Sequence, residues 1–312
     1  MRLLHILRHA ELTVTELTQI LGQSQPRVSR HLKVLCEAGL LERFKEGSWV
    51  FYRLADLGLG ASFSKAVLEL DFDDDVLAGD RQRLAAIRAT RASVAAEFFR
   101  TNAADWERIR ALHAPEKDVE AAVLRALAPL PLESLLDAGT GTGRMLELCA
   151  PFIGRGTGVD VSPEMLAIAR DRLERAGMAH CQVRLADIHR LPFRSAVHDA
   201  GFDAVLFHQV LHYLDDPQRA MEEVARVLRP GGRIVIADFA PHDLEFLRNE
   251  LAHRRLGFAD REVEGWFAAS NLNLSAAATV APSADDMKPG EGRLTVRIWT
   301  ATKPSAVSQV AA

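Results

Sequence analysis

Short β-rich segments alternate with helical stretches from Ser134 to the end of the chain. The apolar runs have the length of strands, and turn-forming residues separate them from the helical segments. This alternation is the pattern of a doubly wound, mostly parallel sheet. The expected strands are 135–137, 157–160, 183–186, 204–207 and 233–237, and 294–303 alternates as a further strand. We therefore predict an α/β fold for this part of the chain.

A glycine-rich turn follows the first expected strand. Gly139, Gly141 and Gly143 stand between the strand and a helical segment. Glycine lets a backbone approach a ligand closely, and a helix N-terminus favours a carboxylate or phosphate. The third glycine comes too early for the G-x-G-x-x-G pattern, which disfavours a pyrophosphate ligand.

Acidic residues end the next two expected strands. Asp160 could accept hydrogen bonds from both hydroxyls of a ribose, and Asp187 could accept one from an adenine amine. Open α/β sheets bind ligands at the carboxyl ends of their strands. In the alternative interpretation Asp137 and Asp160 are helix caps and Met165 is a core residue.

The N-terminal segment has the pattern of a winged helix-turn-helix. Residues 13–21 and 24–38 are expected helices joined by Gly22-Gln23, with Ser24 as the N-cap of the second. Two alternating runs, 41–45 and 49–54, are expected to form a hairpin. The fold class expected for the whole chain is therefore an N-terminal winged helix-turn-helix followed by a Rossmann-like α/β domain.

The second of these helices has a face that could enter a DNA major groove. Val28, Leu32 and Leu35 share one face, which turns polar residues outward. Residues 1–56 hold eight Lys and Arg against six Asp and Glu, so the basic groups must act by position. The alternative is a winged helix used for protein contact. The expected DNA contacts are Gln25, Arg27, Ser29, Arg30, Lys33, Arg43 and Lys45.

Between these parts we expect one long helix. Asp73–Val76 is a helix-start signal, and Leu84, Ile87, Val94 and Phe98 recur at helical, heptad-like spacing. Two interpretations stay open: a surface helix packed on one of the domains, or a two-helix dimer seam with Arg91 at a core position. The expected divisions are a DNA-binding domain at 1–56, a helical linker at 57–114, an α/β domain at 115–303 and a disordered tail at 304–312.

Composition excludes several classes of protein. With 48% hydrophobic and 26% charged residues, no run approaches the roughly 18 apolar residues of a membrane span. The first residues lack the pattern of a secretory signal, so we expect a cytoplasmic protein. Cys36, Cys149 and Cys181 form neither a disulfide framework nor a zinc site, and no metal is expected. A net charge of −4 carries no global nucleic-acid signature.

Ser24–Leu40 resembles the recognition helix of the arsenic-resistance-regulator (ArsR) family of bacterial repressors, and the likeness extends to Leu54. The resemblance implies a homodimer that binds double-stranded operator DNA. Many members sense metals through a Cys-x-Cys in the preceding helix, but the matching stretch here, Thr15–Ile20, has no thiol or imidazole. The usual helix before it is shortened or absent, which makes the long middle helix a candidate dimer interface.

The region from about Trp106 to Lys303 resembles the class I S-adenosylmethionine-dependent methyltransferases, closest to the ubiquinone and arsenite methyltransferase group. The matching segments are Asp137–Gly143, Asp160–Met165, Asp187, His208–His212 and Arg229–Arg233. The resemblance implies S-adenosylmethionine as cofactor, with S-adenosylhomocysteine as product or effector. The residues it assigns to the cofactor are Asp137, Gly139, Thr140, Gly141, Gly143, Asp160, Val161, Met165, Ala186, Asp187, Ile188 and His208. With only Cys149 and Cys181 in this region, arsenite methylation is disfavoured.

Methyl transfer needs a general base only when the acceptor carries a proton. The candidates are His208, His212, His242 and His253, of which His212 is preferred; a capping or surface role is the alternative for each. Two functions follow. The chain is a transcription factor that senses S-adenosylmethionine or S-adenosylhomocysteine, or it is a working small-molecule methyltransferase with an autoregulatory DNA-binding domain. The cofactor motifs support both equally.

Overall fold

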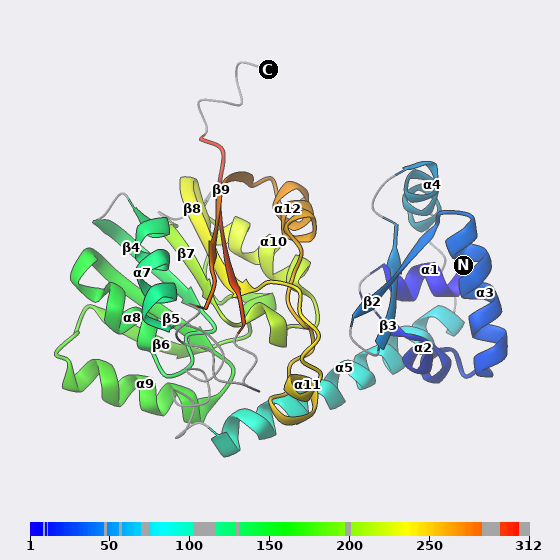
Figure 1. Cartoon of the computed structure of the whole chain (residues 1–312), viewed down its shortest axis with the longest axis horizontal. Coiled ribbons are helices and arrows are strands. Elements are labelled where there is room, and N and C mark those ends of the chain that lie inside the picture. Colours follow the sequence, from blue (N-terminus) through cyan, green and yellow to red (C-terminus); the bar gives the residue numbers. More distant parts are fainter. Residues whose placement is uncertain are drawn as a thin grey trace. The chain divides into compact units, whose positions relative to one another are not determined.

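A computed structural model describes residues 1–8, 10, 12–46, 49–55, 58–69, 75–102, 116–128, 131–196, 201–282 and 294–305. The chain divides into two compact units, Met1–Ala95 and Ala96–Ala312 (Figure 1). Residues 306–312 of the expected tail and residues 103–115 of the expected linker lie outside the described part.

The N-terminal unit is a winged helix-turn-helix, as predicted. Its elements are α1 (Arg2–Leu7), β1 (Leu12–Thr13), α2 (Val14–Leu21), α3 (Gln25–Glu37), β2 (Leu41–Glu46), β3 (Trp49–Leu54), α4 (Gly58–Leu68) and most of α5 (Asp75–Asn102). The strands form one antiparallel sheet in the order β1-β3-β2. A capping box of Thr13 and Glu16 starts α2, and Gly22 ends it in the left-handed conformation at φ +62°. These local signals place the turn of the motif between α2 and α3.

Helix α5 confirms the long middle helix and contributes to the core of this unit. Leu17, Ile20 and Leu32 from the helix-turn-helix are fully buried, and Leu84 of α5 is buried in the same cluster. Ile87 packs against that cluster. The surface-helix interpretation therefore holds for this part of α5. The side chains of Val94 and Phe98 lie outside the described set, and a dimer seam there stays a prediction.

The C-terminal unit is the predicted doubly wound α/β domain. Its elements are α7 (Glu116–Leu127), β4 (Leu132–Ala138), α8 (Arg144–Cys149), η2 (Ala150–Phe152), β5 (Ile153–Asp160), α9 (Pro163–Arg175), β6 (Cys181–Leu185), η3 (Ile188–Arg190), β7 (Phe202–His208), η4 (Leu211–Tyr213), α10 (Pro217–Val227), β8 (Leu228–Phe239), α11 (Phe246–Glu250), α12 (Asp260–Ala269), β9 (Asn273–Val280) and β10 (Val296–Thr302). The sheet runs β6-β5-β4-β7-β8-β10-β9. Strands β4 to β8 pair in parallel, and β10 is antiparallel to both its neighbours.

Strands β8 and β9 differ from the strands expected from the sequence. Strand β8 begins at Leu228, five residues before the expected strand 233–237, with a register shift between the pairs Phe202–Leu228 and Ala204–Arg233. Strand β9 was not predicted, because its Ala-rich and almost wholly exposed side chains show no alternation of buried and exposed residues.

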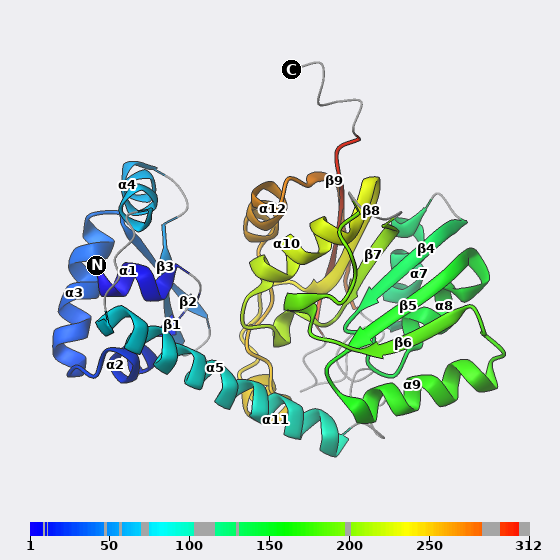
Figure 2. The same cartoon turned by 180° about the vertical axis from the view of Figure 1, so that it is seen from behind.

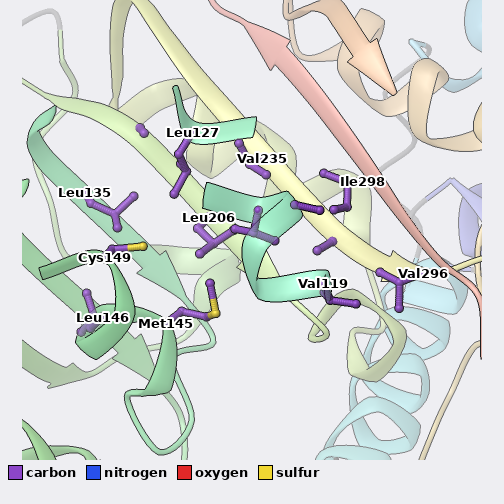
Figure 3. Packing of buried hydrophobic residues seen from close by; sticks show 14 of the residues in the cluster. Val119, Leu127, Leu135, Met145, Leu146, Cys149, Leu206, Val235, Val296 and Ile298 are labelled. Carbon is purple, nitrogen blue, oxygen red and sulfur yellow. The ribbon is translucent and has the colours of Figure 1, made fainter. Parts of the chain in front are cut away.

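Helices cover both faces of this sheet (Figures 1 and 2). Successive strand residues point to opposite faces, so Leu135 packs under α7 and α8 while Leu136 packs on the side of α10 and α12. Figure 3 shows the first cluster, with Val119 and Leu127 of α7 against Leu206 of β7. This packing fixes the strands whose ends carry the predicted ligand residues. Among the described residues, no helix is long and apolar enough to cross a membrane.

Candidate functional site

The carboxyl ends of four neighbouring parallel strands carry polar side chains. Asp137 lies at the end of β4, Asp160 ends β5, His208 ends β7 and Asp238 lies at the end of β8. The parallel register brings these ends to one edge of the sheet. The structure thus gathers the predicted residues of separate sequence motifs, and Asp238 joins them.

The glycine turn after β4 is constrained by packing as well as by backbone conformation. Gly139 and Gly143 both have φ +78° and Gly141 has φ +51°. A Cβ on Gly139 would lie 2.3 Å from Cγ2 of Val210, and one on Gly143 would lie 2.9 Å from Cβ of Ala169. Gly139 and Gly143 are therefore needed for the close approach of neighbouring elements, a reason that the sequence pattern does not reveal.

Asp160 links the glycine turn to the next loop. Its Oδ2 accepts from the Gly141 N–H at 2.9 Å, and its Oδ1 accepts from the Ser162 N–H at 2.9 Å. Burial raises the pKa of Asp160 above its ordinary value, and the backbone N–H donors partly oppose that rise. Each carboxylate oxygen has a second lone pair, which can accept a hydrogen bond from a hydroxyl group of a ligand. Asp160 is thus held rigidly as an acceptor.

Asp137, at the end of β4, holds the same turn through a hydrogen bond from Thr140. It is 1% exposed, and its Oδ2 accepts from Oγ1 of Thr140 at 2.6 Å. The N–H groups of Gly139 and Thr140 donate to the carbonyl of Val159, at 2.8 and 2.9 Å. These bonds tie the end of β4 to the end of β5.

The residues expected around an adenine occupy contrasting environments. Asp187 has a side chain that is 59% exposed, and its Oδ1 accepts from the His189 N–H at 2.9 Å. A side-chain hydrogen bond from His189 lowers the pKa of Asp187. Met165 and Ile188 are buried and Val161 is exposed. The Ala186 N–H donates to the Asp160 carbonyl at 2.9 Å, which holds the loop after β6 next to the end of β5.

A buried histidine and carboxylate form a close pair beside these loops. His212, on η4, is 2% exposed, and its Nδ1 lies 2.7 Å from Oδ1 of Asp238, which is fully buried. Asp238 also accepts from the Leu211 N–H at 2.9 Å and the Phe239 N–H at 2.8 Å. Because a carboxylate only accepts hydrogen bonds, the proton of the neutral imidazole lies on Nδ1 and leaves Nε2 as the basic nitrogen.

Aromatic rings enclose this pair. The ring of His212 lies 4.2 Å from that of His253 and 4.1 Å from that of Tyr213, between centroids. Phe239 stacks on His253 at 5.7 Å. Burial raises the pKa of Tyr213 well above its ordinary value. The surroundings of His212 are therefore largely shielded from water.

Sequence reasoning missed Asp238. Its signal was available, since it follows the apolar run of the fifth expected strand at the edge where Asp137 and Asp160 lie. His242 and His253, the other candidate bases, lie beyond β8, and the N–H of Leu244 donates to Nδ1 of His242 at 3.2 Å.

The described residues include no cluster of His, Cys, Asp and Glu that could hold a metal ion. Burial raises the pKa of the Cys149 thiol to about 12 and also raises the pKa of Cys181 and Cys36. Buried thiols with raised pKa values are weak nucleophiles and poor metal ligands.

A second surface lies on the N-terminal unit. Along α3, Val28 and Leu32 are buried while the predicted contact residues are exposed. The exposed set comprises Gln25, Arg27, Ser29, Arg30 and Lys33, together with Arg43 and Lys45 of β2. The structure adds His31 and Val34, which is 56% exposed on the same helix. An exposed apolar side chain on such a helix can contact a thymine methyl group.

Two family models match separate parts of the chain. Residues 1–43 match the bacterial regulatory protein, arsR family, and residues 136–236 match a methyltransferase domain. The second match contains the glycine turn, Asp160, Asp187 and the His208–His212 segment.

Curated relatives match over part of their length. An uncharacterized 37.1 kDa protein in transposon TN4556 of Streptomyces fradiae is 38% identical over 125 residues, which cover 39% of this chain and 34% of that protein. A demethylmenaquinone methyltransferase of Clavibacter sepedonicus is 36% identical over 127 residues, covering 41% and 49%. The chain thus spans about half or less of the length of these relatives.

A solved structure shares the fold of the C-terminal unit. In a Haloferax volcanii complex between the Trm112 methyltransferase activator and a methyltransferase, the matched chain aligns with a TM-score of 0.54 at 24% identity. The alignment covers 66% of this chain and 97% of that one.

Proposed function

We propose that this chain, which joins an arsR-family helix-turn-helix to a methyltransferase domain, binds S-adenosylmethionine and transfers its methyl group to a small molecule. In this proposal the N-terminal unit binds operator DNA. The observation that carries it is the gathering of Asp160, the glycine turn and the His212–Asp238 pair along one edge of the sheet.

The adenosyl part of the cofactor would lie across the ends of β4, β5 and β6. Asp160 would accept the ribose hydroxyls, because its carboxylate is already oriented by two backbone donors. Asp187 would accept from the adenine amine, since its side chain is exposed at the next loop. The methyltransferase relatives favour this cofactor over another nucleoside.

The acceptor would lie on the side of β7 and β8, where the histidines are. Bound S-adenosylmethionine would supply an activated methyl group to the acceptor and would leave as the thioether S-adenosylhomocysteine. When the acceptor is a hydroxyl or amine, its proton goes to Nε2 of His212. Asp238 would orient the ring and stabilise the imidazolium formed.

A regulatory role is supported by the other unit. Helix α2 carries no thiol or imidazole for a metal effector, whereas the exposed face of α3 keeps its basic residues. We therefore propose that the effector is S-adenosylmethionine or S-adenosylhomocysteine, bound by the C-terminal unit, and that the DNA-binding form is a homodimer. Coupling of this kind requires that the ligand prefer one of two DNA-binding states.

Calorimetric titration of S-adenosylhomocysteine into the full chain tests the cofactor assignment. We expect one site per chain, and an affinity that falls roughly ten- to a hundredfold in Asp160→Ala, the range for losing hydrogen bonds to a charged group. Asp171→Ala removes an exposed carboxylate of α9 and is the matched control. Circular dichroism checks that Asp160→Ala folds. Equal affinity in the two variants would contradict the assignment.

Operator binding measured with and without that ligand tests the regulatory role. Fluorescence anisotropy with the DNA upstream of the protein's own gene should show an affinity that changes at saturating ligand in the wild type and not in Asp160→Ala. If the ligand binds but the DNA affinity stays constant, the sensing role fails and the enzyme assignment stands. Conversion of S-adenosylmethionine to S-adenosylhomocysteine with a small-molecule library then tests the enzyme.

A further inference from the structure

A basic cavity of about 230 Å³ lies away from the candidate cofactor edge. Gln182, the second residue of β6, and Phe202, the first residue of β7, both line it. Arg155 and Thr157 also line it, and both precede Asp160, which ends β5. Strand β6 lies at the edge of the sheet opposite β9 (Figure 2).

Strand β6 and its neighbour β5 build one wall of the cavity. Arg155 and Thr157 alternate along β5 and share a face, and Gln182 and Arg184 do the same on β6. The pairing of Thr157 with Gln182 places the two sets side by side. Thr157 is only 3% exposed, so this wall includes a buried hydroxyl as well as two guanidinium groups.

The segment that follows η3 builds the opposite wall, and hydrogen bonds from α10 hold it in place. Phe193 and Arg194 line the cavity from the segment that follows η3. Arg226 of α10 donates to the Phe193 carbonyl at 2.7 Å and to the Leu191 carbonyl at 3.0 Å. Glu223 accepts from the Leu191 N–H at 2.9 Å. These bonds hold the loop, so Phe193 and Arg194 are presented in a defined position.

The charged side chains among the described residues that line the cavity are all positive. Arg155, Arg184 and Arg194 are permanently protonated, and no Asp or Glu is among the described residues that line the cavity. The Arg184 guanidinium lies 5.9 Å from the ring centroid of Phe193, which holds it at the wall. Like charges gathered without a counter-charge repel one another, and a bound anion would relieve that repulsion.

We propose that this cavity binds the phosphate group of a small phosphorylated molecule. Guanidinium groups match phosphate oxygens with paired N–H donors, and three of them approaching from two walls suit a tetrahedral dianion. Thr157 and Gln182 add neutral donors, and Phe193 and Phe202 offer an apolar surface to the rest of the ligand. The volume of about 230 Å³ is large enough for a phosphate group with part of a small molecule attached.

Calorimetric titration with pyrophosphate, at constant ionic strength, tests this site in the full chain. The test variant is the double substitution Arg155→Gln and Arg184→Gln. The control is Arg170→Gln with Arg175→Gln, which removes the same charge from exposed positions of α9. We expect the wild type and control to bind one pyrophosphate per chain, and the test variant to bind at least tenfold more weakly. Affinity for S-adenosylhomocysteine should be the same in all three, so failure of this site is distinct from failure of the cofactor site.

Several results would overturn the proposal. These are no binding by the wild type, equal binding by the test and control variants, or tighter binding of succinate than of pyrophosphate. A fourth is a loss of operator affinity in the test variant when the wild type binds no pyrophosphate, which would assign these arginines to DNA.

Discussion

At the scale of single residues, Asp80 joins the long helix to the helix-turn-helix. It is buried, and its carboxylate accepts from Arg2 at 2.6 Å and from Arg83 at 2.6 Å. The same arginines donate to the carbonyls of Leu21 and Ile20, at the end of α2. One buried carboxylate thus ties α1, the end of α2 and α5 together.

Asp80→Asn should destabilise the N-terminal unit at neutral pH. Burial raises the pKa of Asp80, but hydrogen bonds from Arg2 and Arg83 outweigh it, so the net pKa lies below 3.8. A lowered pKa contributes stability above 3.8 that is lost as pH falls through the folded-state value. We expect a loss of about 1–3 kcal/mol at pH 7 that shrinks in acid.

Hydrogen exchange of α1 and α2 amides measures this loss. Glu69→Gln, at an exposed position, is the control. Equal protection of these amides in the two variants would show that the Asp80 pairs add nothing to stability.

Asp238 should set the tautomer of His212. Long-range ¹⁵N spectra should place the proton on Nδ1 in the wild type and move part of the population to Nε2–H in Asp238→Asn, whose amide can donate to Nδ1. Methyl transfer to an acceptor with a dissociable proton should fall roughly 10²- to 10⁴-fold, the usual contribution of a general base. Asp243→Asn, exposed on the next loop, is the control. An Nε2–H tautomer in the wild type would contradict the assigned pair.

At the scale of elements, replacing a glycine has two free-energy costs, a strained backbone and a steric contact. Gly139, in the turn between β4 and α8, has both, and Gly177, which follows α9, has the first alone. Gly139→Ala would meet Val210 at 2.3 Å and keep φ +78°, whereas Gly177→Ala at φ +66° would meet nothing within 4 Å. We expect Gly177→Ala to cost about 1–2 kcal/mol for the backbone alone and Gly139→Ala to cost more. Urea unfolding of the C-terminal unit measures both.

Val210→Ala should then recover the part of the Gly139→Ala loss that comes from the contact. It should leave the backbone part unchanged, since the φ angle is unaltered. A double variant no more stable than Gly139→Ala would show that the contact is relieved by other movements.

Much of the element pattern follows from local sequence. Apolar periodicity and turn residues predict the helix-turn-helix, the hairpin and the parallel strands, because these elements have signals within a few residues. Strand β9 escapes prediction because its Ala-rich, exposed side chains show no alternation, and only its pairing with β10 defines it as a strand. The position of Asp238 at a strand end could be read from the sequence, but its pairing with His212 could not. That pairing, like the packing of Gly139 against Val210, needs the neighbouring strand or loop in place.

At the scale of the whole molecule, we propose a separate ligand for each unit, operator DNA for the N-terminal unit and the cofactor for the C-terminal unit. Arg30→Ala should weaken operator binding and reduce the slope of log K against log salt by about 0.9 if Arg30 neutralises one phosphate. Arg175→Ala, exposed on α9 of the other unit, should change neither quantity. An unchanged slope in Arg30→Ala would remove this residue from the DNA interface.

Hydrogen exchange with and without saturating S-adenosylhomocysteine tests the cofactor claim most directly, because it locates the ligand as well as detecting it. We expect added protection in peptides 137–145, 158–167 and 185–190, which hold the glycine turn, Asp160 and Asp187. Unchanged exchange in all three peptides, or protection confined to the N-terminal unit, would contradict it.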